Sequence, residues 1–148
     1  MRTFCGVMLI LILGAGPGWA ALGETETSVG ADRQFLHGQI RVEAHEAYRL
    51  HVITDAAGMM VREYVSPEGK VFAVSWQGPY LPSMQQFLGS YFTYLQQYAQ
   101  VQTARQGGPL VIEKDHFVFS SGGHMRWYHG RAYVPSLLPT GVSPEVVQ

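Results

Sequence analysis

The amphipathic stretch from Ser83 to about Thr103 constrains the fold more than any other part of this sequence. Its apolar residues recur at steps of three and four, which places them on one face of an α-helix. They are Met84, Phe87, Leu88, Tyr91, Phe92, Leu95, Tyr98 and Val101. Pro82 lies at the expected start of this long helix, and Gly107-Gly108-Pro109 ends the pattern. A lone amphipathic helix can bury such a face only against another layer of structure.

The sequence before this helix predicts three strands. Apolar and polar residues alternate from Tyr48 to Val52, which is the period of a half-buried strand. Two short segments that follow contain the glycines and the proline typical of tight turns. The predicted elements are a strand from 48, strands over 59–65 and 71–76, and turns at 55–58 and 66–69. Because connections this short make neighbouring strands antiparallel, we expect a three-stranded meander.

The flanking segments predict further elements. In the N-terminal segment 21–47, a short helix is expected from Ser28 to His37, with Ala31, Phe35 and Leu36 facing inward and Gly38 ending it. After the long helix, strands are predicted over 110–112, 116–120 and 124–134, with a hairpin turn at Ser121-Gly122-Gly123. The tail 143–148 has little periodicity.

These elements define the expected fold class. We predict an α+β protein of two layers, in which the long helix covers one face of a mainly antiparallel sheet. The 148 residues suffice for one compact domain, which we place at 48–142.

The first twenty residues are expected to be a signal peptide. Arg2 precedes an apolar run from Phe4 to Leu13, and Gly18-Trp19-Ala20 offers small residues for cleavage after Ala20. The run is too short for a membrane span, which needs about 20 apolar residues, and we expect none in the mature chain. Cys5, the one cysteine, would be removed with this leader, so neither a disulfide nor a thiol nucleophile is expected. The predicted location is periplasmic or secreted.

Charge is scarce and balanced. Ten Lys and Arg face eleven Asp and Glu, and charged residues make up 14% of the chain, which argues against a nucleic-acid partner. Residues 71–104 contain no charged residue, and the polar face of the long helix carries mainly glutamines. Surfaces that dock partners are poor in Lys, Glu and Asp and rich in aromatic residues. We therefore predict a contact face there, with Trp76, Tyr80, Tyr94 and Gln97 as candidates; a glutamine-rich face that meets only solvent is an equally good interpretation.

No pattern of residues indicates catalysis, a metal or a cofactor. The six histidines match no metal-ligand spacing, and the serine at 90 lies inside the predicted helix without a nucleophile elbow. Ser120, Ser121, Asp115 and His124 supply the residue types of a triad, but neighbouring strand residues rarely converge as one. We expect no catalytic residue, no metal and no cofactor.

Several blocks of this chain resemble the domain-of-unknown-function family 2844, which comprises exported bacterial proteins. The blocks are Arg62–Pro67, Gly69, Val71–Val74, Trp76 and Gly78-Pro79; Leu88-Gly89 with Tyr91-Phe92; and Ser121–Arg126 with Gly130–Pro139. The resemblance implies export and supplies no catalytic residues. Within these blocks, packing and turns do not account for His124, Arg126 and Arg131, so we take them as further candidates for binding.

Two functions follow from these observations. The first is an exported, non-catalytic module that binds a protein partner, or a second copy of itself, through the charge-free segment 71–104. The alternative is a small ligand-binding protein or hydrolase that uses His124, Arg126 and Glu63. The alternative requires those three side chains to converge in one pocket.

Overall fold

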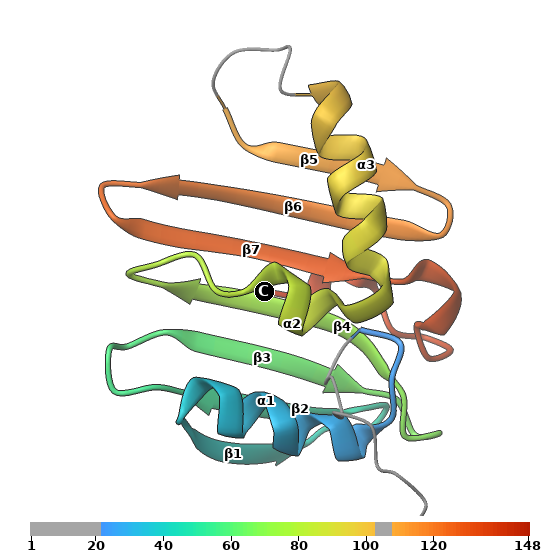
Figure 1. The fold of residues 1–148 in the computed structure, drawn as a ribbon. Coiled ribbons are helices and arrows are strands. Elements are labelled where there is room, and N and C mark those ends of the chain that lie inside the picture. Colours follow the sequence, from blue (N-terminus) through green and yellow to red (C-terminus); the bar gives the residue numbers. More distant parts are fainter. Residues whose placement is uncertain (1–21, 103–107) are drawn as a thin grey trace, which may run out of the picture.

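The computed structural model describes residues 22–102 and 108–148, so the predicted signal peptide lies outside the described residues. Within this part of the chain, seven strands form one antiparallel sheet in the order β1-β2-β3-β4-β7-β6-β5 (Figure 1). The strands are β1 Gln39–Ala44, β2 Arg49–Thr54, β3 Met60–Val65, β4 Val71–Gly78, β5 Leu110–Lys114, β6 Phe117–His124 and β7 Trp127–Tyr133. The helices are α1 Val29–Leu36, α2 Met84–Leu88 and α3 Phe92–Gln102. The α+β class and the antiparallel sheet are confirmed.

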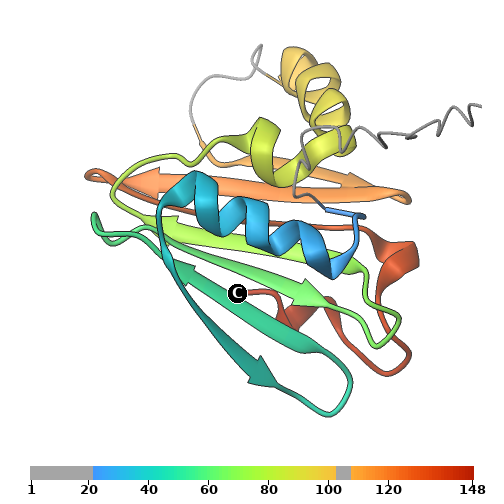
Figure 2. The ribbon, with the colours of Figure 1, turned by 60° about the horizontal axis from the view of Figure 1, so that its bottom comes forward.

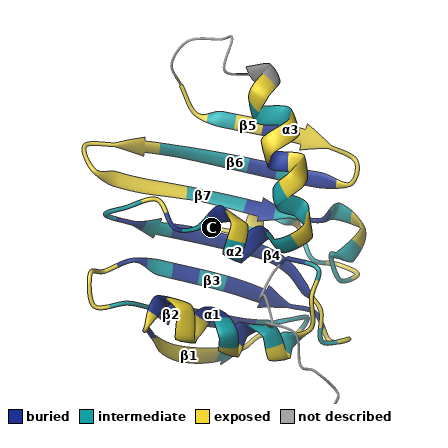
Figure 3. Cartoon of the chain, in the orientation of Figure 1, coloured by how far each residue is buried: buried dark blue, intermediate teal, exposed yellow. Residues whose placement is uncertain are grey.

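The helices all lie on one face of the sheet, and the C-terminal segment crosses the other (Figure 2). Each face has its own core because strand residues alternate between the two sides. On the helical face, Trp76, Val74 and Val61 of the sheet pack with Phe87 and Leu88 of α2. The central strands are therefore buried on both sides, while β1 and the β6–β7 hairpin are exposed (Figure 3).

The long helix over 83–103 is not confirmed. Gly89 has φ 50° and ψ −123°, a conformation that does not continue an α-helix, and a short 3₁₀ turn, Gly89–Tyr91, separates α2 from α3. Glycine has no Cβ and tolerates this backbone geometry, so the break occurs at the glycine within the stretch 83–103. The periodicity of the apolar residues continues across the break, which is why the sequence predicted one helix.

The predicted turn at Ser121–Gly123 is wrong. Strand β6 continues through both glycines to His124, which pairs with Trp127, and the turn consists of Met125 and Arg126. A glycine in a strand often marks a place where another group approaches closely. At Gly123 an added Cβ would lie 3.0 Å from the Tyr128 ring, so this glycine makes room inside the hairpin.

The N-terminal helix is shorter than predicted and turns a different face inward. It ends at His37, which takes the left-handed conformation at φ 51°, and not at Gly38. Leu36 is buried as predicted, but the other buried residues are Val29 and Asp32, and Phe35 is half exposed. The following strand β1 was not predicted, because its residues are exposed and lack the alternation of a half-buried strand.

The C-terminal tail is ordered and covers the sheet. Ser143 caps a 3₁₀ turn over Pro144–Val146, and Val147 is buried against the face that carries Leu50, Tyr64 and Phe72. The Tyr64 hydroxyl donates to the Gln148 carbonyl at 3.2 Å. This packing depends on contacts between residues far apart in the chain, which periodicity within the tail cannot reveal.

Candidate functional site

An apolar groove lies between the helices and the β6–β7 hairpin. Its volume is about 520 Å³, within the range of sites that bind small molecules or peptide side chains. The helical side contributes Leu95 of α3 and Met84 of α2, and the sheet contributes Phe119. The lining also includes Leu81, Ala99, Leu110, His124, Met125, Arg126 and Tyr128. The groove is therefore mainly apolar, with cationic and imidazole groups at one end.

The hairpin tip beside the groove exposes large apolar side chains. Met125 at the tip is 87% exposed, and Leu81, which also lines the groove, is 52% exposed. Both turn residues adopt left-handed backbone, with φ 50° at Met125 and φ 63° at Arg126. A two-residue hairpin of this kind favours Asn-Gly, so a Met-Arg turn stores strain. Strain and solvent-exposed apolar area at one place are typical of a binding surface.

The predicted candidates of the charge-free segment are only partly together at the surface. Tyr94 and Gln97 line one polar hollow of about 410 Å³ on α3, together with Ser90, Tyr91 and Thr93. Tyr94 is partly exposed, and its ring lies 4.8 Å from the imidazole of His116. These two candidates therefore share a surface, as the predicted contact face requires.

Neither Trp76 nor Tyr80 lines this hollow. Trp76 is buried, and its ring packs 5.6 Å from that of Phe119. It occupies the space that Gly130 leaves open, where an added Cβ would lie 2.4 Å from the indole. The Tyr80 hydroxyl donates to a carboxylate oxygen of Asp55, and burial together with this bond raises the pKa of Tyr80 to about 12. Large aromatic residues satisfy core packing as readily as docking, and sequence alone did not separate the two roles.

Arg131 holds the C-terminal segment. Its guanidinium donates to the carbonyls of Pro144 at 3.3 Å and Val147 at 3.2 Å. Together with Trp76, Trp127, His129 and Gln148, it lines a hollow of about 370 Å³. This placement on β7 separates Arg131 from the groove between the helices and the hairpin, and its hydrogen bonds account for it structurally.

Glu63 does not meet His124 and Arg126. Glu63 pairs with Val74 of β4, which pairs with Ala132 of β7. The hairpin tip lies at the start of β7, next to Trp127, which is five residues before Ala132. Five strand residues span about 17 Å. The convergence that a hydrolase built on these three residues requires is absent from the structure.

Instead, Glu63 forms a buried carboxyl pair with Asp32 of α1. Both residues are fully buried, and Gln86 of α2 donates to Asp32 Oδ1 at 2.6 Å. Burial, and then the neighbouring charge of Asp32, raise the pKa of Glu63 well above its usual range, and burial raises the pKa of Asp32 to about 6. No sequence pattern indicates this pair, because its members are thirty-one positions apart and belong to different layers.

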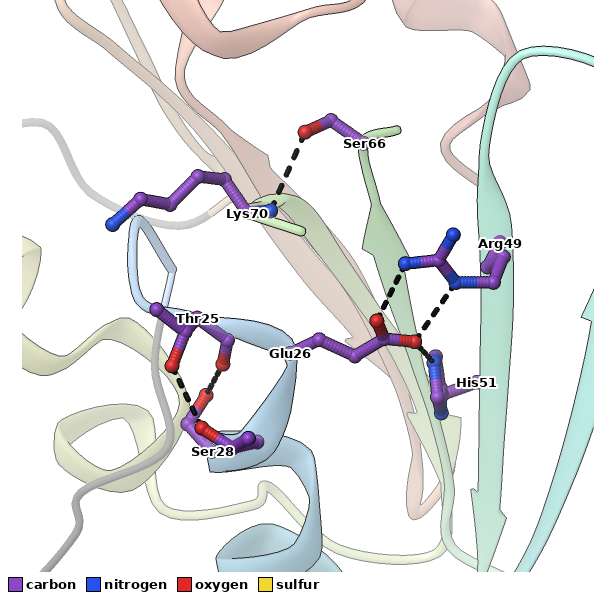
Figure 4. Close-up of polar contacts among 8 residues, drawn as sticks. Thr25, Glu26, Ser28, Arg49, His51, Ser66 and Lys70 are labelled. Carbon is purple, nitrogen blue, oxygen red and sulfur yellow. Dashed lines mark hydrogen bonds and ion pairs between the residues drawn. The ribbon is translucent and has the colours of Figure 1, made fainter. Parts of the chain in front are cut away.

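A second ionic cluster fixes the segment before α1 to the sheet. Glu26 accepts hydrogen bonds from Arg49 Nε at 2.9 Å and contacts His51 Nε2 at 2.8 Å (Figure 4). The Arg49 hydrogen bond is the main cause that lowers the pKa of Glu26 to about 2. Arg49 and His51 both contact Glu26, so the cluster holds the segment before α1 against β2.

The described ranges 22–102 and 108–148 hold neither a cluster of metal ligands nor a membrane-spanning helix. No group of three or more His, Cys, Asp and Glu residues there could hold a metal ion. No helix in those ranges is long and apolar enough to cross a membrane. The groove combines a mainly apolar lining with exposed side chains, which makes it the candidate binding site.

Comparison with known proteins shows which family the chain belongs to. A family model described as "Protein of unknown function (DUF2844)" matches residues 18–147. The chain belongs to the DUF2844 family. No curated protein and no solved structure matches it. The resemblance noted from the sequence blocks is confirmed.

The groove of this DUF2844 protein lies entirely within the matched range. Sequence reasoning missed two of its exposed side chains, Leu81 and Met125. The available signal was the consecutive run of large apolar residues around Arg126, which a surface hairpin does not need. The DUF2844 blocks contain both large apolar residues and glycines typical of turns. Only the structure shows which of these residues lie at the surface of the groove.

Proposed function

We propose that this protein is an exported, non-catalytic module that binds another protein through the groove and the hairpin tip. The observation that carries the proposal is the exposed apolar area around the groove, above all Met125 at 87% exposure. Burying such area is the main source of affinity in protein association.

The charge distribution supports the same proposal. The helical wall of the groove comes from the segment 71–104, which contains no Asp, Glu, Lys or Arg. A partner that docks there would desolvate few charges, and desolvated charges are costly. Arg126 at the end of the groove provides one cation, which would orient an acidic group of the partner.

Export is the second part of the proposal. The basic residue at position 2, the apolar run over 4–13 and the small residues before position 21 support a cleaved leader. The family match begins at residue 18, close to the proposed cleavage point. Cell fractionation and N-terminal sequencing test this part: we expect a mature chain that begins at Ala21, outside the cytoplasm. Recovery from the cytosol with Met1 retained would contradict it.

The binding part is tested by charging the groove. Leu81→Glu and Met125→Glu each place a carboxylate in the apolar rim without disturbing a buried side chain. We expect both variants to lose the proteins that co-purify with the wild type from the cell envelope, while Ala57→Glu in the exposed β2–β3 turn retains them. Unchanged co-purification by both groove variants would contradict the proposal.

A small-molecule ligand is the second candidate for the groove. Its volume of about 520 Å³ and the presence of His124 and Arg126 among its lining residues favour an apolar ligand with an anionic end. A fatty acid of medium length is a suitable probe. Thermal stabilisation by this probe that Arg126→Gln reduces, together with no captured protein, would favour this function over the first.

A further inference from the structure

Strand β1 is an open edge of the sheet. It pairs with β2 on one side, and no described residue pairs with its other side. Its side chains are exposed over almost the whole length, with Val42 at 52% and Ile40 at 37% (Figure 3). Proteins usually protect such an edge, because its unpaired backbone groups are a template for another strand.

The register identifies the backbone groups that face outward. The N–H of His45 donates to the carbonyl of Tyr48 at 2.9 Å, which closes the turn between β1 and β2. Hydrogen-bonded and non-hydrogen-bonded pairs then alternate along an antiparallel ladder. Residues 43, 41 and 39 bond to β2, so the N–H and C=O groups of Ile40, Val42 and Ala44 point away from the sheet.

The sequence of β1 is complementary to itself in the antiparallel sense. With a two-fold axis at Val42, the outward groups of Ile40 meet those of Ala44 in a second copy, and Val42 meets Val42. The same axis places Arg41 directly opposite Glu43, in the pair type whose side chains lie closest. Charges of opposite sign thus face each other twice across the axis.

We propose that two copies of this chain pair through β1, about a two-fold axis at Val42, into one continuous antiparallel sheet. The other edge offers no such match. Pairing β5 with itself about Ile112 would set Glu113 opposite Val111 and Lys114 opposite Leu110. Since β1 and the groove lie toward opposite edges of the sheet, the dimer would leave both grooves open to partners (Figure 1).

The first test removes one outward donor. Val42→Pro deletes an N–H that does not bond to β2, and proline is tolerated on edge strands for this reason. Sedimentation velocity over a range of concentrations should show the wild type passing from monomer to dimer and the variant remaining a monomer. Far-UV circular dichroism should be the same for both. A monomeric wild type at the highest soluble concentration, or a dimer that survives Val42→Pro, would overturn the proposal.

The second test swaps the charges and does not depend on backbone tolerance. Arg41→Glu or Glu43→Arg alone places like charges opposite each other, and each should raise the dimer dissociation constant about tenfold. The double variant Arg41→Glu with Glu43→Arg restores opposite pairs and should return the constant to about the wild-type value. Both side chains are at least 38% exposed, so the monomer should fold in all three variants. A double variant as weak as the single variants would show that another surface makes the dimer.

Discussion

At the scale of single residues, the buried carboxyl pair makes stability depend on pH. The pKa of Asp32 rises to about 6 on folding, and that of Glu63 rises well above its usual range. A raised carboxyl pKa means that the folded state binds more protons than the unfolded state. Ionisation of the pair therefore does not destabilise the folded state below about pH 4. The free energy of unfolding falls as the pH rises through the folded pKa values.

Glu63→Gln should relieve that loss. The amide stays neutral and can donate to Asp32, so we expect the unfolding temperature to rise at about pH 8 and to change little at about pH 4. Thermal unfolding at the two pH values measures this, with Glu113→Gln, an exposed acid on β5, as the control. Equal shifts at both pH values would contradict the buried pair.

Gly130 is a second residue whose role is local. A Cβ there would lie 2.4 Å from the Trp76 ring and 2.5 Å from the Ser120 carbonyl oxygen. Gly130→Ala should therefore lower the free energy of unfolding by about 2 kcal/mol through overpacking. Gly30→Ala in α1 meets nothing within 4 Å and should instead stabilise by about 0.5 kcal/mol. Urea unfolding measures the free energy of unfolding of both variants. An unchanged free energy of unfolding for Gly130→Ala would refute the close packing.

At the scale of elements, the β6–β7 hairpin holds strain at its tip. Met125 and Arg126 both occupy left-handed backbone that Asn-Gly would adopt at lower cost. Replacing them by Met125→Asn and Arg126→Gly should raise the free energy of unfolding by about 1 kcal/mol and weaken partner binding. Chemical unfolding and co-purification measure the two effects. A turn replacement that leaves binding intact would mean that the tip takes no part in it.

Elements also show what the sequence could and could not predict. The strands over 59–65 and 71–76 were predicted because a short turn fixes them as neighbours, and β3 and β4 confirm them. The helix break at Gly89 and the turn at Met125 were missed for a common reason. In each case the prediction followed a pattern that is local in sequence: the apolar periodicity continues across Gly89, and Ser121-Gly122-Gly123 has the composition of a turn. The same limit hid the contact of Asp32 with Glu63.

At the scale of the whole molecule, one sheet carries two separate cores. The helices close one face, and the C-terminal segment closes the other through Val147, which is fully buried. Two open parts of the described chain are the β1 edge and the groove beside the hairpin. An exported module with two such surfaces could dimerise at one and bind a partner at the other.

The tail should therefore contribute to stability of the entire sheet. Val147→Ala removes two buried carbons and leaves a cavity, so we expect the free energy of unfolding to fall by about 2 kcal/mol. Val146→Ala, one position earlier and only half-buried, should cost less. Denaturant melts compare the two variants. Equal, small effects would indicate that the tail does not pack as described.

Site-specific photo-crosslinking in the native cells tests the central claim, that the groove is a protein-binding surface. A photoreactive amino acid is placed at Met125 or Leu81, and, as a control, at Glu68 in the exposed β3–β4 turn. We predict discrete adducts of one partner at the two groove positions and none at Glu68. Adducts that are equal at all three positions, or absent at both groove positions, would contradict the account.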